Sequence, residues 1–376
     1  MTGWSALCFS LVALAFAAPA AAEPIEMERG YKPGAASLAV ARDGGTFVVL
    51  QSVDRDVRPG DAPKRATLLE FLRFRRDGGL YGAATLPPVG KRAEGVPRIA
   101  VLPSGEVALF APGGYPDGPR SIAQLLRLSA DGEVRHRADV GEPAPDSGNC
   151  GNGLLYANVL ESGPEGTLLV GGGRCDGPNT PWWVHLSADG RKLAEGSDSG
   201  FTPGPGVTAA AFEADGRFRL AGSHFSGMGK FDATLSFHRA DGRLEARHTL
   251  LQQGGEVGWT LFTSDGVVFI GDGRRDDSAV RFYDRDGKLL RSTPWPEKNL
   301  PTSLIADGDG IAGLLGDFDG LAQIVRIDSS GRIAWRSPPA NYLSLARAPD
   351  GALRTLVSRA DEKGGYTVDL LTFAKP

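Results

Sequence analysis

Residues Phe212–Leu250 read FEADGRFRLAGSHFSGMGKFDATLSFHRADGRLEARHTL and contain two Asp-Gly pairs, Asp215-Gly216 and Asp241-Gly242. Each pair is flanked by runs in which apolar residues alternate or cluster. Asp-Gly between two such runs is a strong hairpin signal, because a type I′ turn needs a positive φ at both central residues. The stretch therefore predicts four strands joined by a tight turn, a long loop and a second tight turn, which is one antiparallel meander.

The same pattern recurs along the whole chain, with a first turn about every 40–60 residues. The first turns are Asp43-Gly44, Ser104-Gly105, Glu165-Gly166, Asp215-Gly216, Asp265-Gly266, Asp309-Gly310 and Asp350-Gly351. The second turns are Asp77-Gly78, Asp131-Gly132, Asp189-Gly190, Asp241-Gly242, Asp286-Gly287 and Ser330-Gly331. Four-stranded units of this length are typical of propeller blades. The spacing predicts an all-β fold, a single seven-bladed β-propeller of four-stranded antiparallel blades.

The seventh unit is incomplete. It has a first strand (Asn341–Arg347), a second (Ala352–Ser358) and a third (Tyr366–Phe373), but no fourth strand follows. The run Ile25–Tyr31 near the N-terminus belongs to no other unit. We expect this run to become the missing outer strand of the last blade and so to join the two ends of the chain. The alternative is a disordered N-terminal tail.

Units four to six share a more detailed pattern. Unit four contains EADGRFRLAG followed by FDATLSFHRADGRL, and unit five contains SDGVVFIG followed by SAVRFYDRDGKL. These runs resemble the bacterial delta-sixty type of propeller repeat. The resemblance extends over most of the mature chain as a repeat pattern, and it implies a propeller but no particular activity. Units one to three depart from the pattern through longer loops, and no WD or kelch signature is present.

Residues 1–22 differ in composition from the rest of the chain. Trp4–Ala22 has no charged residue, and Ala20-Ala21-Ala22 forms an A-x-A site before Glu23. The segment predicts a secretory signal peptide, although its first three residues include no Lys or Arg. The mature propeller domain would then consist of residues 23–376. The alternative is a membrane anchor, for which the apolar run is short, since a spanning helix needs ~20 residues. We expect a periplasmic or secreted protein that is not inserted in a membrane after cleavage.

The mature chain has two cysteines, Cys150 and Cys175. An even number of cysteines in an exported protein favours a disulfide. The runs Leu154–Leu160 and Thr167–Val170 would form a hairpin with both cysteines at its open end. Two unpaired buried thiols are the alternative, and the spacing does not fit a C-x-x-C redox site.

The overall composition limits the classes of partner. The chain has 41 basic and 45 acidic residues, which are well mixed and give a net charge of -4. This balance argues against nucleic-acid binding, which requires a basic surface. The 52 glycines and 3 methionines suit many short strands and turns rather than a helical bundle.

Candidate binding residues are expected on one face of the propeller. The loops between second and third strands gather there with the connections between blades, and loops on a rigid scaffold often carry function. We call this side the long-loop face, and the opposite side, with its tight turns, the turn face. His224 is the one histidine expected in such a loop, where it could be a ligand or a general base. The other candidates for ligand contacts are Arg174, Arg274 and Arg275 for anions, and Trp295 and Tyr115 for stacking on sugars. The alternatives are ordinary exposed basic residues and aromatic rings that cover apolar contacts of their own loops.

Two acidic stretches lie in loops of neighbouring units, Asp272–Asp277 and Asp317–Gly320. If Asp277, Asp317 and Asp319 faced one channel, they could bind Ca²⁺, which takes six to eight oxygen ligands. Neither stretch matches an EF-hand loop, and acidic turns are also common simply because they are well solvated.

No group of catalytic residues stands out, since neither H-E-x-x-H nor G-x-S-x-G occurs. The sequence therefore favours a monomeric, non-enzymatic module that binds a protein, a small molecule or a saccharide on the long-loop face. The alternative is a calcium-dependent hydrolase of the lactonase or esterase type, with its site at the central channel, because some propellers hold such a metal there.

Overall fold

The computed structural model describes residues 20–21, 24–56, 67–86, 96–111, 123–140, 155–175, 179–197, 206–227, 230–254, 258–264, 266–271, 278–297, 300–316 and 321–375. The backbone alone is described for residues 20–21, 155–156, 174–175, 179–180, 197, 224–227, 230–231 and 253–254. These ranges are all-β apart from one short 3-10 helix, η1 (Pro164–Gly166). They contain no helix with the length and apolar character to cross a membrane.

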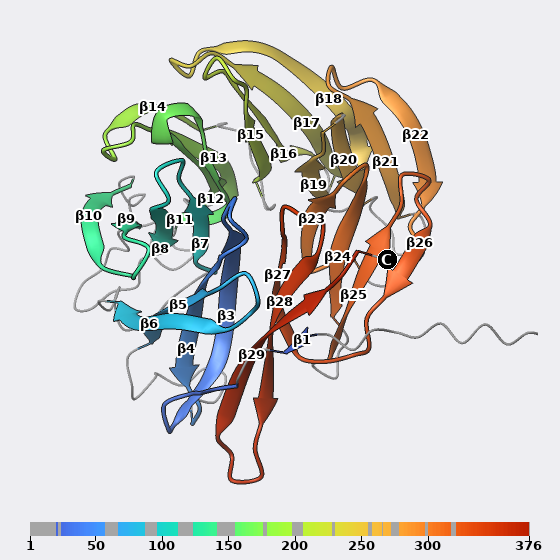
Figure 1. Cartoon of the computed structure of the whole chain (residues 1–376). Helices are drawn as coiled ribbons and strands as arrows, with labels where there is room; N and C mark the ends of the chain where they lie inside the picture. The colour runs from blue at the N-terminus through green and yellow to red at the C-terminus, as the bar shows by residue number, and fades with distance from the viewer. Residues whose placement is uncertain are drawn as a thin grey trace, which may run out of the picture.

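Seven antiparallel sheets form a ring, and the colours of Figure 1 pass around it in chain order. The first three blades consist of β3 (Tyr31–Val40), β4 (Thr46–Asp54), β5 (Leu68–Phe74) and β6 (Leu80–Leu86); β7 (Arg98–Val101), β8 (Val107–Ala111), β9 (Gln124–Leu128) and β10 (Val134–Asp139); and β11 (Leu155–Ser162), β12 (Leu168–Cys175), β13 (Asn179–Leu186) and β14 (Lys192–Ser197). The next three consist of β15 (Val207–Phe212), β16 (Phe218–Gly227), β17 (Lys230–His238) and β18 (Leu244–Gly254); β19 (Trp259–Phe262), β20 (Gly266–Ile270), β21 (Ala279–Asp284) and β22 (Leu289–Pro294); and β23 (Ser303–Asp307), β24 (Gly310–Gly316), β25 (Ala322–Ile327) and β26 (Ile333–Arg336). The predicted seven-bladed β-propeller is confirmed.

The seventh blade combines strands from both ends of the chain. It contains β27 (Tyr342–Arg347), β28 (Leu353–Ala360) and β29 (Tyr366–Phe373), and the outer edge of β29 pairs with β1 (Ala20–Ala21) and β2 (Ile25–Glu26). Figure 1 accordingly shows the blue β1 beside the red β29. The predicted pairing of an N-terminal strand with the last blade is confirmed, but this strand is Ile25–Glu26 rather than Ile25–Tyr31, because Tyr31 begins β3 of blade 1.

The pairing between the two ends is specific in register. Ile25 pairs with Val368, and the Met27 N–H donates to the Tyr366 carbonyl at 2.9 Å. Met27 is 8% exposed and packs in the apolar core between blades 7 and 1. Since β1 lies within the predicted signal peptide, cleavage after Ala22 would leave β2 as the outer strand.

The tight turns differ from the predicted type I′ geometry. In the turn before β4, the Gly44 N–H donates to the Ala41 carbonyl at 2.9 Å, and Gly44 has a φ of 86°. Asp43 keeps a negative φ, and its Oδ1 accepts a hydrogen bond from the Gly45 N–H at 2.8 Å. This is a type I turn followed by a glycine bulge, which places aspartate where its carboxylate can bind the backbone.

Only one described turn has a positive φ at both central residues. Glu165 has a φ of 56° and Gly166 a φ of 79°, as a type I′ turn requires. The turn before β24 centres on Gly308 and Asp309, one residue earlier than predicted, because Asp307 pairs directly with Gly310. The Asp-Gly pairs therefore predicted where most hairpins lie. The predicted turn type, I′, was wrong at most of these hairpins.

The hydrophobic core is divided among the joints between neighbouring blades. Leu125, Val170 and Trp182 belong to the cluster between blades 2 and 3. Trp182 is 1% exposed, so at least one ring of the Trp182-Trp183 pair is in the core. Each blade therefore depends for its stability on the blade beside it.

Polar side chains also connect adjacent blades. Arg127 on β9 donates to the Ala188 carbonyl in the second turn of blade 3. His185 on β13 repeats this contact one blade further, where its Nδ1 lies 3.0 Å from the Ala240 carbonyl. At both joints, a side chain on the third strand of one blade is hydrogen-bonded to a backbone carbonyl in a turn of the next blade.

Arg354 makes a similar contact across the point where the ring closes. It lies on β28 in blade 7 and is 2% exposed. Its guanidinium donates to the Gly44 carbonyl and the Thr46 hydroxyl, and to the Arg76 carbonyl at 2.9 Å, all in blade 1. The ring is therefore closed in two places, by this side chain and by the outer strand β2.

Candidate functional site

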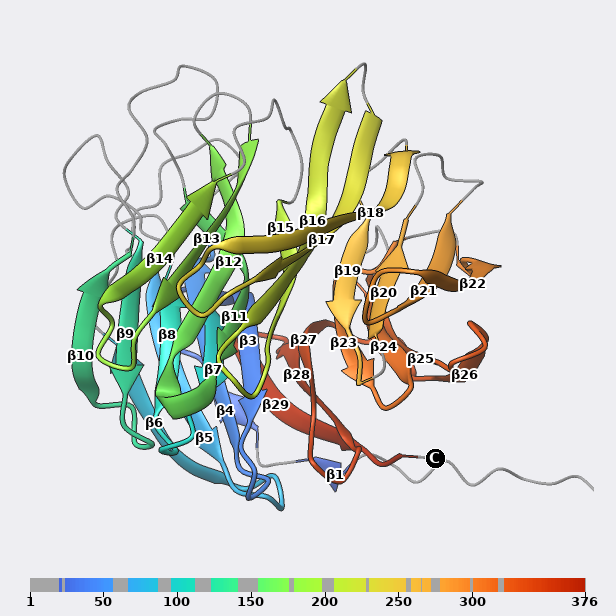
Figure 2. The same cartoon turned by 90° about the horizontal axis from the view of Figure 1, so that it is seen from above.

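A cavity of about 600 Å³ lies at the centre of the ring, and the first strands of all seven blades line it. Each first strand leads into a tight turn, so its first residue lies nearer the long-loop face and its last residue nearer the turn face. Figure 2 shows this arrangement from the side. Because ligand sites are usually mostly apolar cavities with a few convergent polar groups, this channel is a candidate functional site.

Arg98 lies at the long-loop end of the channel, as the first residue of β7. Its Nε donates to the Ala157 carbonyl of blade 3 at 3.2 Å, which orients the guanidinium. Burial lowers the pKa of Arg98 to about 10, and no neighbouring carboxylate contributes to this shift. The side chain is therefore half-buried and still cationic at neutral pH.

Neutral groups complete this end of the channel. Trp259 is half-exposed at the start of β19, and Ser303 occupies the same position in β23. The Asn158 amide donates to the Val207 carbonyl at 2.9 Å, so it ties blade 3 to blade 4 while it borders the cavity. Among the residues that the structure describes, the channel mouth thus offers the Arg98 cation, the half-exposed ring of Trp259 and several hydrogen-bonding groups.

Glu161 lies toward the other end of the channel, near the end of β11. Its side chain is exposed to the channel, yet the surrounding strands replace part of its water. This desolvation raises the pKa of the Glu161 carboxyl to about 7. Channel water still reaches the carboxyl, and this water offsets part of the cost of ionising Glu161.

Replacing Glu161 with glutamine is expected to stabilise the protein at pH 8.5 but not at pH 4. The carboxyl is neutral in both folded and unfolded chains at low pH, and its stabilising contribution is lost as the pH rises to about 7. We expect a gain of about 1 kcal/mol at pH 8.5 after allowing for screening. Urea unfolding of both proteins across this pH range measures it. Glu362→Gln, in an exposed turn, is the control, and an equal effect of the two substitutions at pH 8.5 would contradict the prediction.

Most site residues suggested by the sequence lie outside the described ranges. These are Tyr115, Cys150, Arg274, Arg275, Asp277, Asp317 and Asp319. The backbones of Arg174 and Cys175 are described as the last two residues of β12, where Cys175 pairs with Asn179. The disulfide and the calcium site stay predictions. Within the described ranges, no three His, Cys, Asp or Glu side chains form a group that could hold a metal ion.

His224 lies in a strand rather than in a loop. We expected a loop here, but β16 and β17 continue to pair as far as Gly227 and Lys230, with His224 opposite Asp232. Figure 2 shows this hairpin projecting beyond the ring on the long-loop face. The loop prediction was wrong because serine and glycine suggested a break, although a β-ladder requires only backbone donors and acceptors.

Trp295 is 7% exposed and lies in the core between blades 5 and 6. Its neighbours in that cluster include Phe282 and Ile311. Its backbone N–H donates to the Ser278 carbonyl at 2.7 Å. The buried ring favours the alternative that this aromatic covers apolar contacts rather than stacking on a sugar.

The sequence reasoning missed Arg98, Glu161 and Trp259. All three lie in first strands, where the repeat predicts small and apolar residues. A charged residue at such a position departs from the pattern, and this departure was the available signal for Arg98 and Glu161. These residues line one channel only because the ring of blades closes, and a local sequence pattern does not show which strands come together.

Three solved structures are similar to this chain in fold. The β-propeller domain of the Trilobed protease from Pyrococcus furiosus has a TM-score of 0.54 and 9% identity, covering 91% of this chain and 97% of that one. Sqt1 from Chaetomium thermophilum has a TM-score of 0.51 and 9% identity, with 94% and 97% covered. The WD40 domain of Toxoplasma gondii coronin has a TM-score of 0.51 and 12% identity, with 90% and 81% covered.

These likenesses show the β-propeller fold and nothing of the function, because the identities are so low. The Pyrococcus domain is described as having an open velcro topology, whereas β2 closes the last blade of this chain. No protein-family model matches the chain, and no curated protein matches it.

Proposed function

We propose that this chain is an exported, non-enzymatic binding module that holds an anionic group of its ligand at the long-loop mouth of the channel. The observation that carries the proposal is the half-buried guanidinium of Arg98, whose pKa is lowered by burial without the influence of any carboxylate. A partly desolvated cation attracts an anion more strongly than an exposed one, because less water screens the charge.

Two further features support a binding role at this place. Trp259 gives the mouth a half-exposed aromatic surface, and aromatic rings and arginines are enriched where proteins bind one another. The first strands that carry these groups are held on both sides by neighbouring blades, so the site is rigid before any ligand binds.

The test is calorimetric titration of the mature protein with citrate and with a tetra-aspartate peptide at low ionic strength. Arg98→Gln is expected to weaken binding about tenfold, which corresponds to the loss of one hydrogen-bonded charge. Arg332→Gln, in an exposed turn between β25 and β26, is the matched control and should bind as the wild type does. Equal affinities of the wild type and Arg98→Gln, or no binding of either probe by the wild type, would refute the proposal.

A further inference from the structure

The wall of the channel carries two opposite charges, one toward each end. Arg98 is the first residue of β7, and Glu161 is the last but one residue of β11, the first strand of the next blade. Among the residues that the structure describes, no other charged side chain lines this cavity. The two charges therefore face the same space from neighbouring strands.

Strand geometry gives the separation of these charges. Arg98 Nε donates to the Ala157 carbonyl at 3.2 Å, which holds the guanidinium near the start of β11. Glu161 follows Ala157 on the same strand, beyond a bulge between Ala157 and Val159. At ~3.3 Å per residue, and less at the bulge, the guanidinium and the carboxyl lie about 12 Å apart along the channel. They are too far apart to pair with each other.

Neither charge is neutralised within the described part of the chain. The hydrogen bond from Arg98 goes to a backbone carbonyl, and no described carboxylate pairs with the guanidinium. No described side chain is hydrogen-bonded to the Glu161 carboxyl or forms an ion pair with it, and desolvation alone raises its pKa to about 7. A carboxylate that has lost water without gaining a partner is unfavourable, and a bound cation would offset that cost.

The rest of the described lining is neutral. The Ser37 hydroxyl accepts a hydrogen bond from the Ile99 N–H at 3.3 Å, and the Thr208 and Thr260 hydroxyls are bonded to each other. Alanine and leucine side chains supply much of the remaining surface. The part of a ligand that lies between the two charges should therefore be uncharged.

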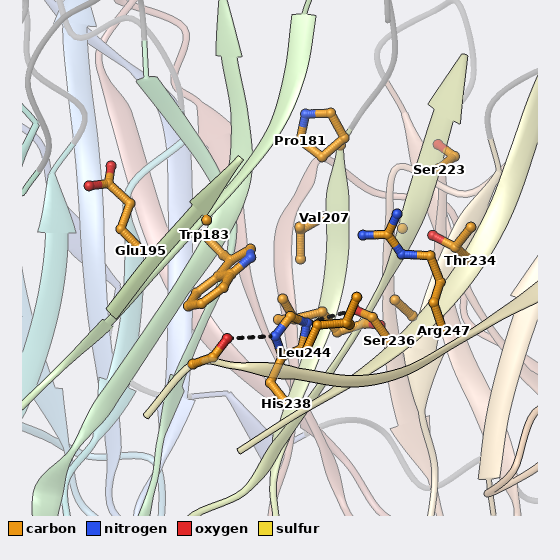
Figure 3. Close-up of a pocket in the computed structure, with 16 residues that line it drawn as sticks. Pro181, Trp183, Glu195, Val207, Ser223, Thr234, Ser236, His238, Leu244 and Arg247 are labelled. Carbon is orange, nitrogen blue, oxygen red and sulfur yellow. Dashed lines mark hydrogen bonds between the residues drawn. The ribbon is translucent and has the colours of Figure 1, made fainter. Parts of the chain in front are cut away.

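The channel differs in this respect from a second cavity, of about 280 Å³, between blades 3 and 4 (Figure 3). The Glu195 carboxylate in that cavity accepts hydrogen bonds from Trp182 Nε1 at 2.9 Å and from Lys192 Nζ at 2.6 Å. Both ring nitrogens of His238 are hydrogen-bonded as well, as the dashed lines of Figure 3 mark. These groups are engaged within the protein, whereas the carboxyl and guanidinium of the channel can still take a charged partner.

We propose that the channel binds a small linear zwitterion, whose carboxylate pairs with Arg98 and whose ammonium pairs with Glu161. The inference rests on the proposed function, because it gives the anionic group of the ligand to the same guanidinium. Ionic hydrogen bonds of about 2.8 Å at both ends leave about 6–7 Å between the two charges of the ligand. An extended dipeptide has this span at ~3.5 Å per residue, and so has an aliphatic amino acid with its amine on the sixth carbon.

Calorimetric titration of the mature protein with dialanine at pH 7.5 and low ionic strength tests the proposal. At this pH most Glu161 carboxyls are ionised, and most dialanine molecules carry an ammonium. We expect a dissociation constant of about 1 mM, and at least about tenfold weaker binding of free alanine, which is too short to reach both groups. 6-Aminohexanoate has a similar span without an amide, so the tighter of the two longer ligands identifies a peptide or an aliphatic amino acid as the source. Failure of both to bind would overturn the proposal.

Two variants separate this inference from the proposed function. Glu161→Gln should weaken dialanine binding about tenfold, but it should leave the binding of N-acetyl-dialanine, which has no ammonium, unchanged. Arg98→Gln should weaken the binding of both ligands, because both have the carboxylate. Equal dialanine affinities of the wild type and Glu161→Gln would overturn the zwitterion and leave the proposed function standing. N-acetyl-dialanine affinities that do not depend on Arg98 would overturn both.

The controls separate binding from folding. Glu161→Gln removes a desolvated carboxylate, so at pH 7.5 the free variant should be at least as stable as the wild type. Glu362→Gln removes an exposed carboxylate in a turn outside the channel and should bind dialanine as the wild type does. If Glu362→Gln weakened dialanine binding as much as Glu161→Gln, the effect would come from the overall charge, and the proposal would be overturned.

Discussion

Replacing Arg354 with methionine is expected to lower the free energy of unfolding by about 3 kcal/mol. The guanidinium is 2% exposed and donates to three acceptors on blade 1, among them the carbonyls of Gly44 and Arg76. Methionine fills much of the same space but leaves these buried acceptors without donors. Burial lowers the pKa of Arg354 and Asp350 opposes that shift, so the group remains charged at neutral pH.

Urea unfolding followed by circular dichroism measures the effect. Arg354→Lys keeps the charge but not the planar arrangement of donors, so it should be intermediate in stability. Arg332→Met replaces an exposed arginine and is expected to change stability by less than about 0.5 kcal/mol. If Arg354→Met were as stable as Arg332→Met, the contact across the ring closure would not contribute to stability.

Removing the N-terminal outer strand is expected to have an effect of similar or larger size. A chain that starts at Arg29 instead of Glu23 lacks β2 and Met27, which pair with β29 and pack between blades 7 and 1. Loss of the buried Met27 and Ile25 surface and of the backbone hydrogen bonds should lower stability by about 3–5 kcal/mol. The uncovered edge of β29 would also become available for pairing with another chain.

Two readouts test this prediction, urea unfolding and the mass in solution from light scattering. The shortened chain should be less stable and should form dimers or larger species as its concentration rises. Met27→Asp should destabilise the full mature chain in the same direction, whereas Glu28→Lys, at an exposed neighbouring position, should not. A shortened chain that stays monomeric and equally stable would show that β2 is dispensable.

Most of the fold could be predicted from repeated local signals. The third strand of the last unit, Tyr366–Phe373, was predicted to the residue, because a turn precedes it and apolar residues recur within it. The turn type could not be predicted from Asp-Gly alone, because both a type I′ turn and a type I turn with a bulge accept that pair. Strand pairing beyond Gly222 was missed for a related reason, since backbone hydrogen bonds leave little trace in side-chain composition.

The candidate sites were much less predictable. Arg98 and Glu161 are 63 residues apart in the numbering of the chain, and they share a cavity only because seven first strands converge. Gly172, Gly206 and Gly222 come into direct contact between blades 3 and 4, although the sequence around each of them shows only that the segment is rich in glycine. Sites that form between blades require knowledge of which surfaces face each other, and the repeat pattern does not contain it.

The pairing of Ile25 with Val368 also has a consequence for the order of events during synthesis. Strands of blades 1 to 6 are neighbours in sequence and can form hairpins as soon as they are made, but β2 must wait for β29, which is translated much later. An interrupted chain that lacks β29 cannot close, and its first strand stays without a partner. The closed ring therefore forms only after β29 has been translated, and shorter products leave the edge that β2 would cover unmade.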